Sequence, residues 1–343
     1  MQDNTHVKNV IITGGAGFIG SHMADFLLAK GVRVKVVDNF STGKMRFIEH
    51  NLQNPMFSYE TADIKDQEAL TKAFCTWGVE KQHYDIVFHF AANADVKGNV
   101  TNPTKCLHEN GIGTSNVLEA MRANNIKKIV FSSTGSIYGE PEVFPTPEDA
   151  PFPIQTSMYG ASKAYGEGLI SAYCEAYGMQ SWIYRFVSIL GERYTHGVVF
   201  SFYQQLMLQQ QNNESLQMIF LSDGTPRKSF LYVGDCISGI WHGVTHANNN
   251  VNIFNLGTDE EIVVRELGEI LVHELRLQDN VTYQFGKTQR GWIGDSPFIR
   301  LDIRKLQSLG WQPRCSIRDA IKKTAHYLRD NSWVLGEKYF RDT

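Results

Sequence analysis

Residues 10–20 read VIITGGAGFIG, a short apolar run followed by three spaced glycines, Gly14, Gly17 and Gly20. In a strand–turn–helix unit the first glycine permits the tight turn, the second lets the backbone approach a pyrophosphate, and the third lets the helix pack on the strand. The amino end of the helix offers N–H groups and a positive dipole end to phosphates. The stretch therefore predicts a dinucleotide-binding unit, although glycines also punctuate ordinary turns.

The segment VKVVD that follows this helix predicts a second strand, which ends at Asp38. A carboxylate at that position accepts hydrogen bonds from ribose hydroxyls, and its charge repels a 2′-phosphate. This context favours the dinucleotide interpretation over an ordinary turn. It also favours NAD over NADP.

The composition is that of an ordinary globular protein, with 343 residues, 42% apolar residues and a formal net charge of −3. The near-neutral balance argues against nucleic acid or an anionic membrane as the main partner. The first ten residues contain no apolar signal core and no stretch approaches membrane-spanning length, so we expect a cytoplasmic protein. The five cysteines are dispersed and the eleven histidines show no ligand spacing, so we expect no metal site.

Apolar β-branched runs alternate with helical patterns up to about residue 185, and this alternation predicts an α/β fold. The architecture we expect is a Rossmann-type doubly wound parallel sheet followed by a smaller lobe that binds substrate. The boundary is placed between residues 1–185 and residues 186–343, with segments that cross between the two. The predicted strands are VKNVIIT, VRVKVVD, YDIVFHF, KKIVFSS and QSWIYRF, and the predicted helices cover 20–30, 66–77, 104–124, 158–178, 198–211, 234–246, 263–275 and 316–330.

Tyr159 and Lys163 open the predicted helix 158–178 in the sequence YGASK. Residues four apart lie on one helix face, so a phenol and an ammonium can enter one site. The ammonium would favour the ionised phenol and lower its pKa, so that it removes a hydroxyl proton near neutral pH. The alternative is that the tyrosine and the lysine simply lie on a half-exposed helix and have no catalytic role. The dinucleotide-binding pattern earlier in the chain disfavours this alternative.

The segment FSSTGSIYG, residues 131–139, lies at the carboxyl end of a predicted strand, where α/β sheets bind ligands. Thr134 could share a hydrogen bond with an oxygen of the bound substrate, while Ser132 and Ser133 line the wall of the binding site. The alternative is that these hydroxyls only form hydrogen bonds with nearby backbone groups at the end of the strand.

The chain resembles the extended short-chain dehydrogenase/reductase family, in its nucleotide-sugar epimerase and dehydratase branch. Within that branch the later motifs are most similar to those of UDP-glucose 4-epimerases. The motifs that carry the resemblance are GGAGFIG, DNFSTGK, ADI, HFAANADV, ENGIGTSNVLEA, SSTGSIYG, YGASKAYGE, RFVSILGERYTHGVV, SDGTPRKSFLYVGDC, NIFNLGTDEEIVV, RGWIGDSP and LDIRKLQSLGWQP.

The resemblance implies that NAD is the cofactor and assigns its contacts. The catalytic residues it implies are Tyr159 as base, Lys163 as electrostatic helper and ribose clamp, and Thr134 as hydrogen-bonding partner. The cofactor-binding residues it implies are Gly14, Gly17, Phe18, Ile19, Gly20, Asp38, Asn39, Thr42, Gly43, Asp63, Ile64, Phe90, Ala91, Ala92, Asn110, Ser132, Ser133, Tyr159 and Lys163.

The resemblance also assigns substrate contacts, with two departures from the family pattern. Ser188 stands where relatives carry asparagine, and Trp292 stands where they carry an arginine, so Arg290 is the candidate for the diphosphate together with Lys228. The alternative for Lys228 and for Arg290 is that each is an ordinary surface charge in contact with solvent. The substrate-binding residues we expect are Thr134, Ser136, Tyr159, Ser188, Val199, Lys228 and Arg290; Ser136, His196 or the loop around residue 90 could close the sugar pocket.

The reaction that the resemblance implies is NAD-dependent 4-epimerisation of a nucleotide sugar, most like UDP-glucose, through a 4-keto intermediate, and epimerisation at C2 or C5 is an open alternative. A 4,6- or 5,6-eliminating dehydratase is the nearest alternative; such relatives carry Asp-Glu after the threonine, where this chain has Gly135 and Ser136. Uronic acid decarboxylation and a non-catalytic NAD(H) sensor are further alternatives. Relatives pair through two helices, so we expect a homodimer through 104–124 and 158–178.

Overall fold

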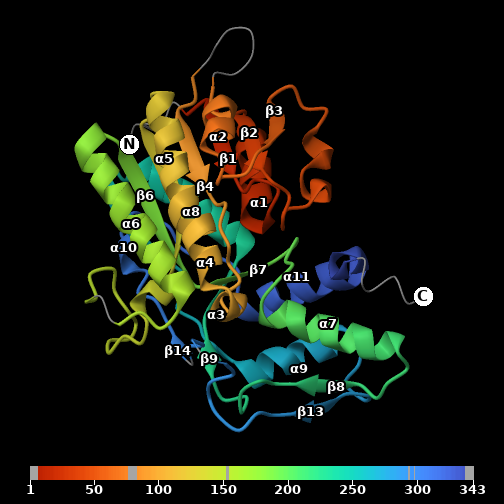
Figure 1. Cartoon of the computed structure of the whole chain (residues 1–343). Coiled ribbons are helices and arrows are strands. Elements are labelled where there is room, and N and C mark those ends of the chain that lie inside the picture. The colour runs from red at the N-terminus through yellow and green to blue at the C-terminus, as the bar shows by residue number, and fades with distance from the viewer. Residues whose placement is uncertain (1–6, 76–82, 152–153, 293, 297, 337–343) are drawn as a thin grey trace. The chain divides into compact units, whose positions relative to one another are not determined.

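The structure is a computed structural model that describes residues 7–75, 83–151, 154–292, 294–296 and 298–336 (Figure 1). The chain divides into two compact units. The first contains Met1–Phe186, Ile237–Leu256 and Asp302–Gln312, and the second contains Val187–Cys236, Gly257–Leu301 and Pro313–Thr343. Two segments of the later half of the chain thus belong to the first unit.

The first unit is built on a seven-stranded sheet in which every neighbouring pair is parallel. This sheet confirms the expected Rossmann-type α/β fold. In spatial order its strands are β11 (Val251–Leu256), β6 (Gln180–Phe186), β5 (Lys128–Thr134), β4 (Ile86–His89), β1 (Asn9–Thr13), β2 (Arg33–Asp38) and β3 (Phe57–Thr61).

The two edge strands, β3 and β11, are absent from the sequence prediction. Strand β3 reads FSYET and alternates between buried and exposed positions, so it lacks the continuous apolar run of a central parallel strand. Strand β11 reads VNIFNL and follows a run of asparagines, which reads as a loop. Both strands have a neighbour on one side only, so the sheet tolerates their polar residues.

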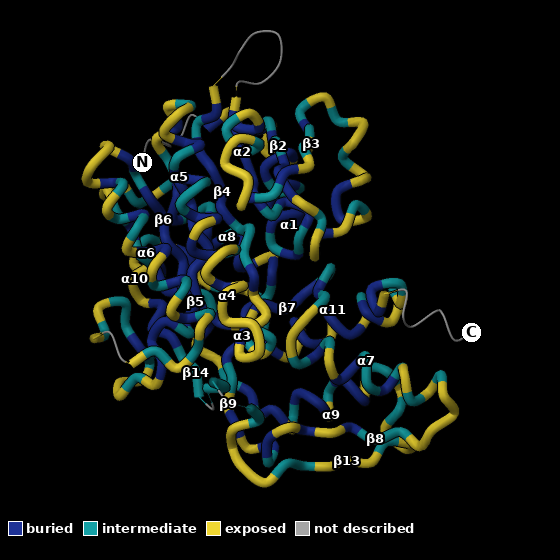
Figure 2. The backbone as a smooth tube through the Cα atoms, viewed as in Figure 1, coloured by how far each residue is buried: buried dark blue, intermediate teal, exposed yellow. Residues whose placement is uncertain are grey.

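Helices cover the sheet, and its central strands are buried, as Figure 2 shows. Alternate strand residues such as Ile11, Val87 and Ile129 join one apolar cluster with side chains of α2, α5 and α6. The first unit contains α1 (Phe18–Ala29), α2 (Gln67–Ala73), α3 (Gly98–Thr101), α4 (Pro103–Cys106), a π-helical segment (Leu107–Ile112), α5 (Gly113–Ala123), α6 (Met158–Tyr177), α10 (Arg304–Gln307), most of α8 (Val233–His246) and 3-10 turns at Met45–Phe47, Glu49–Asn51 and Gly135–Tyr138.

The second unit packs three long helices with small sheets. Strands β7 and β10 pair in parallel, β9 pairs with β12 and β14, and β8 pairs with β13. Among the residues that the structure describes, no helix combines the length and the apolar character needed to cross a membrane. The elements are α7 (Val198–Gln211), α9 (Val264–Glu274), α11 (Ile317–Asp330), β7 (Ser188–Leu190), β8 (Gln217–Ile219), β9 (Arg227–Lys228), β10 (Phe230–Tyr232), β12 (Ile262–Val263), β13 (Thr282–Gln284), β14 (Phe298–Ile299) and a 3-10 turn at Ser332–Leu335.

Candidate active site

The glycine-rich turn has the geometry that a pyrophosphate site requires. Gly14 has a φ of +69°, and a Cβ there would lie 2.6 Å from the backbone nitrogen of Ala91. A Cβ on Gly20 would collide with the carbonyl oxygen of Gly14. Helix α1 begins after Gly17, which has no side chain to cap it. The turn therefore admits only glycine at its closest approaches, and the amino end of α1 suits an anion.

Asp38 lies at the carboxyl end of β2, with both carboxylate oxygens held by backbone. Its Oδ2 accepts a hydrogen bond from the Ala16 N–H at 2.9 Å, and its Oδ1 accepts one from the Phe40 N–H at 2.8 Å. Burial raises the pKa of Asp38, and these two N–H groups act to lower it. Each carboxylate oxygen has a second lone pair, so the group can still accept a ribose hydroxyl.

The segments that follow β2 and β3 are joined by a side-chain hydrogen bond. Asn39 Nδ2 donates to Asp63 Oδ2 at 3.0 Å, and the backbone N–H of Lys65 donates to Asp63 Oδ1 at 2.8 Å. Ile64 is buried beside them, whereas Thr42 is exposed. The parts of the chain assigned to adenosine thus meet at one edge of the sheet.

The loop after β4 is fixed by Asn110, which lies in the π-helical segment. Asn110 Oδ1 accepts from the Asn93 N–H at 2.7 Å, and its Nδ2 donates to the Asn93 carbonyl at 3.1 Å and to Ser162 Oγ at 2.9 Å. This amide therefore ties the loop 90–93, with its expected cofactor residues, to α6. A direct contact between Asn110 and a cofactor stays a prediction.

Tyr159 and Lys163 lie one turn apart on α6 and face the end of β5. Lys163 is 2% exposed, and its Nζ donates to the Ser132 carbonyl at 2.7 Å and lies 6.0 Å from the centroid of the Tyr159 ring. Thr134 forms a side-chain hydrogen bond with the phenol, and its Oγ1 accepts from the Ser136 N–H at 3.1 Å. The three residues expected to be catalytic therefore come together within the first unit.

Burial dominates the electrostatics of this pair. It raises the pKa of Tyr159, reinforced by Cys106, and the hydrogen bond with Thr134 acts in the opposite direction. Burial lowers the pKa of Lys163 to about 7, and Cys106 and Glu167 act to raise it. The raised pKa of the phenol differs from the sequence expectation, because spacing along a helix carries no information about burial.

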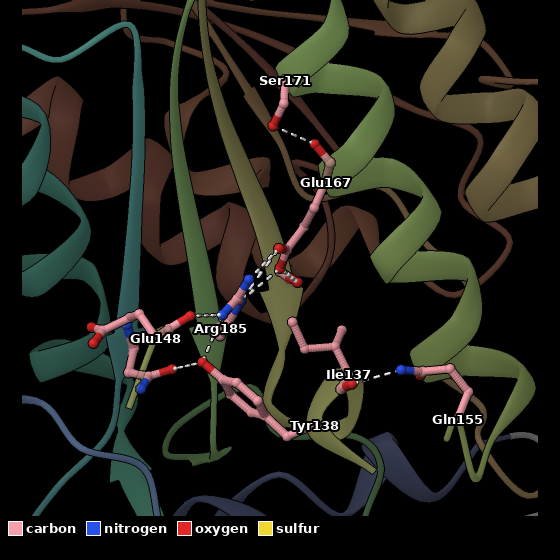
Figure 3. A network of polar contacts seen from close by, with 9 residues as sticks. Ile137, Tyr138, Glu148, Gln155, Glu167, Ser171 and Arg185 are labelled. Carbon is pink, nitrogen blue, oxygen red and sulfur yellow. Dashed lines mark hydrogen bonds and ion pairs between the residues drawn. The ribbon is translucent and has the colours of Figure 1, made fainter. Parts of the chain in front are cut away.

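A buried polar network that sequence reasoning missed joins β5, α6 and β6, and Figure 3 shows its Glu167 and Arg185. Ser133 Oγ donates a hydrogen bond to Glu167, which also forms an ion pair with Arg185 at 2.7 Å. Arg185 Nη1 donates to the Tyr138 hydroxyl at 2.7 Å and to the Glu148 carbonyl at 2.8 Å. Ser133 is thus bonded within the protein, and its expected cofactor contact stays a prediction. The available signal was Glu167, one turn after the lysine.

His89 is a second group that sequence reasoning missed. Its Nδ1 lies 2.7 Å from Thr13 Oγ1, and its Nε2 lies 3.0 Å from Thr114 Oγ1. Burial, and then the charge of Lys163, lower the pKa of His89 to about 3. This neutral histidine joins the strand that precedes the glycine-rich turn to α5.

The remaining expected residues belong to the second unit and are described within it. Lys228 Nζ donates to Asp295 Oδ1 at 2.8 Å, so its charge already has a carboxylate partner. Val199 is fully buried in α7, whereas Ser188 and Arg290 are exposed. Their contacts with a substrate stay predictions.

Comparisons with known proteins cover most of the chain. The model of the family described as NAD dependent epimerase/dehydratase family matches residues 10–257. A Methanocaldococcus jannaschii protein, provisionally named a UDP-glucose 4-epimerase, is 35% identical over 328 residues, which are 94% of this chain and 99% of that protein. UDP-glucuronic acid decarboxylase 1 of Danio rerio is 29% identical over 94% of this chain and 72% of its own length.

A solved structure also matches most of the chain. The crystal structure of UDP-glucose 4-epimerase from Thermotoga maritima with UDP-glucose has a TM-score of 0.79 and 30% sequence identity to this chain. The match covers 94% of this chain and 99% of that one. The similarity therefore includes both units.

Proposed function

The chain belongs to the NAD dependent epimerase/dehydratase family, and we propose on that basis that it epimerises a nucleotide sugar at C4. UDP-glucose and UDP-galactose are the proposed pair, interconverted through a transient 4-keto sugar. Relatives named for this reaction and for decarboxylation both match the chain, so the assignment depends on the residues of the site.

The first unit fits NAD on structural grounds. The backbone approach at Gly14 leaves no room for a side chain, and the uncapped start of α1 suits the pyrophosphate. Asp38 would accept the ribose hydroxyls and disfavour a 2′-phosphate. When bound, NAD supplies the acceptor and later the donor of the sugar hydride.

The residues at the end of β5 and on α6 would handle the proton. Tyr159, once ionised, takes the proton of the sugar hydroxyl, and Thr134 holds the same oxygen through its hydroxyl. The protonated form of Lys163 favours the phenolate, and its pKa of about 7 keeps both of its forms accessible near neutral pH. In the return step Tyr159 would give the proton back to the same oxygen, after the keto sugar has turned its other face towards the cofactor site.

The observation that carries the epimerase assignment is the pairing of Thr134 with Tyr159, followed in the chain by Gly135 and Ser136. Elimination of water needs an acid and a base near the sugar carbons that react. Neither glycine nor serine supplies a carboxyl group there, so dehydration is disfavoured. The complete set of Tyr159, Lys163 and Thr134 disfavours a non-catalytic sensor.

The nucleotide is proposed to bind residues of the second unit. Arg290 and Lys228 are the cations for the diphosphate, and Ser188 and Val199 stand at the positions that relatives use near the phosphate and the uracil. Because Lys228 is paired with Asp295, its role requires that the diphosphate compete with that carboxylate.

The test is incubation of the purified protein with UDP-glucose, followed by proton NMR of the anomeric signals. Appearance of UDP-galactose supports the proposal. A Tyr159→Phe variant should retain NAD and lose about 100-fold or more of the turnover. A 4-keto-6-deoxy sugar or a decarboxylated pentose as product would identify one of the other reactions of the family, and an inert protein that binds NAD would indicate a sensor.

The proposed homodimer rests on an apolar surface along the π-helical segment and α6. Leu107 is 57% exposed, Tyr165 53% and Tyr177 44%. Other apolar residues of the expected helices 104–124 and 158–178, such as Val117 and Ile170, are fully buried in the core of the first unit. The apolar residues of these helices therefore divide between the core and an exposed face, and the exposed part would pair with a second copy.

A further inference from the structure

We propose that Glu167 and Arg185 form a positioning unit that holds the end of β5 in register with the catalytic face of α6. This inference rests on the proposed function, because it concerns the same tyrosine and lysine. It assigns a role to a buried ion pair that contacts neither reacting group.

The first two links between α6 and β5 involve the catalytic residues themselves. Tyr159 is hydrogen-bonded to the hydroxyl of Thr134, and Lys163 donates to the carbonyl of Ser132. The two helix residues are one turn apart and point to one side. Two residues of the strand end thus set the positions of the phenol and the ammonium.

The third link falls between these two in the strand and one turn further along the helix. Glu167 lies four residues after Lys163, and it accepts the hydroxyl of Ser133. Three consecutive residues at the end of β5 are therefore each bonded to successive turns of α6. A shift of Ser133 would move the residues on both sides of it.

Arg185, on the neighbouring strand β6, fixes the carboxylate that makes this third link. Its Nε lies 3.0 Å from Glu167 Oε1, its Nη2 lies 2.7 Å from Oε2, and the two side chains are only 4% and 6% exposed. The other side of the guanidinium donates to Tyr138 and Glu148 (Figure 3). The guanidinium is therefore held on both sides, and through its Nε and Nη2 it fixes the carboxylate that accepts from Ser133.

Stability alone is a weak explanation for this pair. A buried ion pair can often be replaced by well-packed apolar residues with little loss of stability. Such residues could hold α6 against the sheet, but they could not accept the hydroxyl of Ser133. The positioning role can therefore be separated from the structural one by substitution.

The experiment compares Glu167→Gln, Ser133→Ala and the double variant Glu167→Met/Arg185→Met with the parent, each with its bound NAD. The matched control is Tyr184→Phe, on the same strand as Arg185, which removes a buried hydrogen bond to the Ile240 carbonyl. We expect kcat to fall about 10- to 100-fold in the three test variants, because small misplacements of reacting groups have effects of this size. KM and NAD content should change little, and Tyr184→Phe should keep the kcat of the parent.

A readout that needs no turnover is the ultraviolet titration of the phenol, taken as the difference between each protein and its Tyr159→Phe counterpart. Loss of the third link should weaken the hydrogen bond from Thr134 and raise the pH at which Tyr159 ionises. The inference would be overturned if Ser133→Ala left both kcat and the titration of Tyr159 unchanged. It would also be overturned if the double variant kept the kcat of the parent. If the parent turns over no nucleotide sugar, the proposed function fails, and the titration alone decides on the positioning role.

Discussion

Lys163→Met should stabilise the protein in mildly acidic solution while it reduces turnover. The fall in the pKa of Lys163 from an ordinary 10.5 to about 7 corresponds to about 5 kcal/mol, at about 1.4 kcal/mol for each tenfold change in the proton equilibrium. Below pH 7 the unfolded chain and the folded protein both carry the charge, so the full cost of burying it is present there. Methionine has no such cost.

The substitution also removes a hydrogen bond. The Ser132 carbonyl would lose its donor, at a cost of about 1–3 kcal/mol. The expected net gain at about pH 6 is therefore about 2–4 kcal/mol in the free energy of unfolding. As pH rises from the folded pKa of about 7 towards the unfolded value of 10.5, the folded lysine is neutral and the cost declines. At about pH 9 it has fallen to about 2 kcal/mol, so the advantage of the variant should nearly disappear.

Urea unfolding of the parent and the variant at about pH 6 and about pH 9 measures this difference. Lys72→Met is the control, because Lys72 is exposed and its pKa is raised by its hydrogen bond with Glu68, so it stays charged throughout. A Lys163→Met protein that is no more stable than the parent at the lower pH, or whose advantage is the same at both, would refute the reasoning. It would mean that the ammonium is not buried at the described depth.

Three further predictions follow from the geometry. Gly14→Ala should abolish NAD retention, measured by absorbance of the released cofactor, because its Cβ would meet the backbone of Ala91 and φ is +69°. The ring of His89 should show no titration by NMR between about pH 5 and 8, and stability should fall as pH drops below the ordinary 6.5, because only the unfolded chain then takes up the proton. Leu107→Glu with Tyr177→Glu should give a monomer by sedimentation equilibrium, and a dimer that persists would place the interface elsewhere.

The central part of the fold could be predicted because its signals are local. Strands β1 and β4 contain continuous apolar runs, and the turn at Gly14 needs glycine, which the sequence shows directly. The edge strands β3 and β11 escaped prediction because a single neighbour relaxes the demand for apolar residues. The expected helix 104–124 contains a π-helical segment at Leu107–Ile112, which has no distinct sequence pattern.

The grouping of the candidate residues could be predicted from the sequence, but their contacts could not. The spacing of Tyr159 and Lys163 places them on one helix face, and in the structure Tyr159 meets Thr134 and Lys163 meets the Ser132 carbonyl. Their catalytic roles stay predictions. The partner of Lys228 is Asp295, which lies 67 residues away in the chain, and no local pattern joins them. Partners at such separations depend on tertiary packing, so charges that look available in a sequence can already be neutralised.

The close approach of Gly43 to Asp38 imposes an order on any redesign of cofactor preference. A Cβ at position 43 would lie 2.8 Å from Oδ1 and 3.0 Å from Oδ2 of the carboxylate. Substitution at 43 therefore displaces the carboxylate, and shortening the aspartate removes the two closest contacts and leaves a 3.1 Å approach to the backbone of Ala16. A library that varies one position at a time would score position 43 as unfavourable, whereas paired variation would recover routes that begin at position 38.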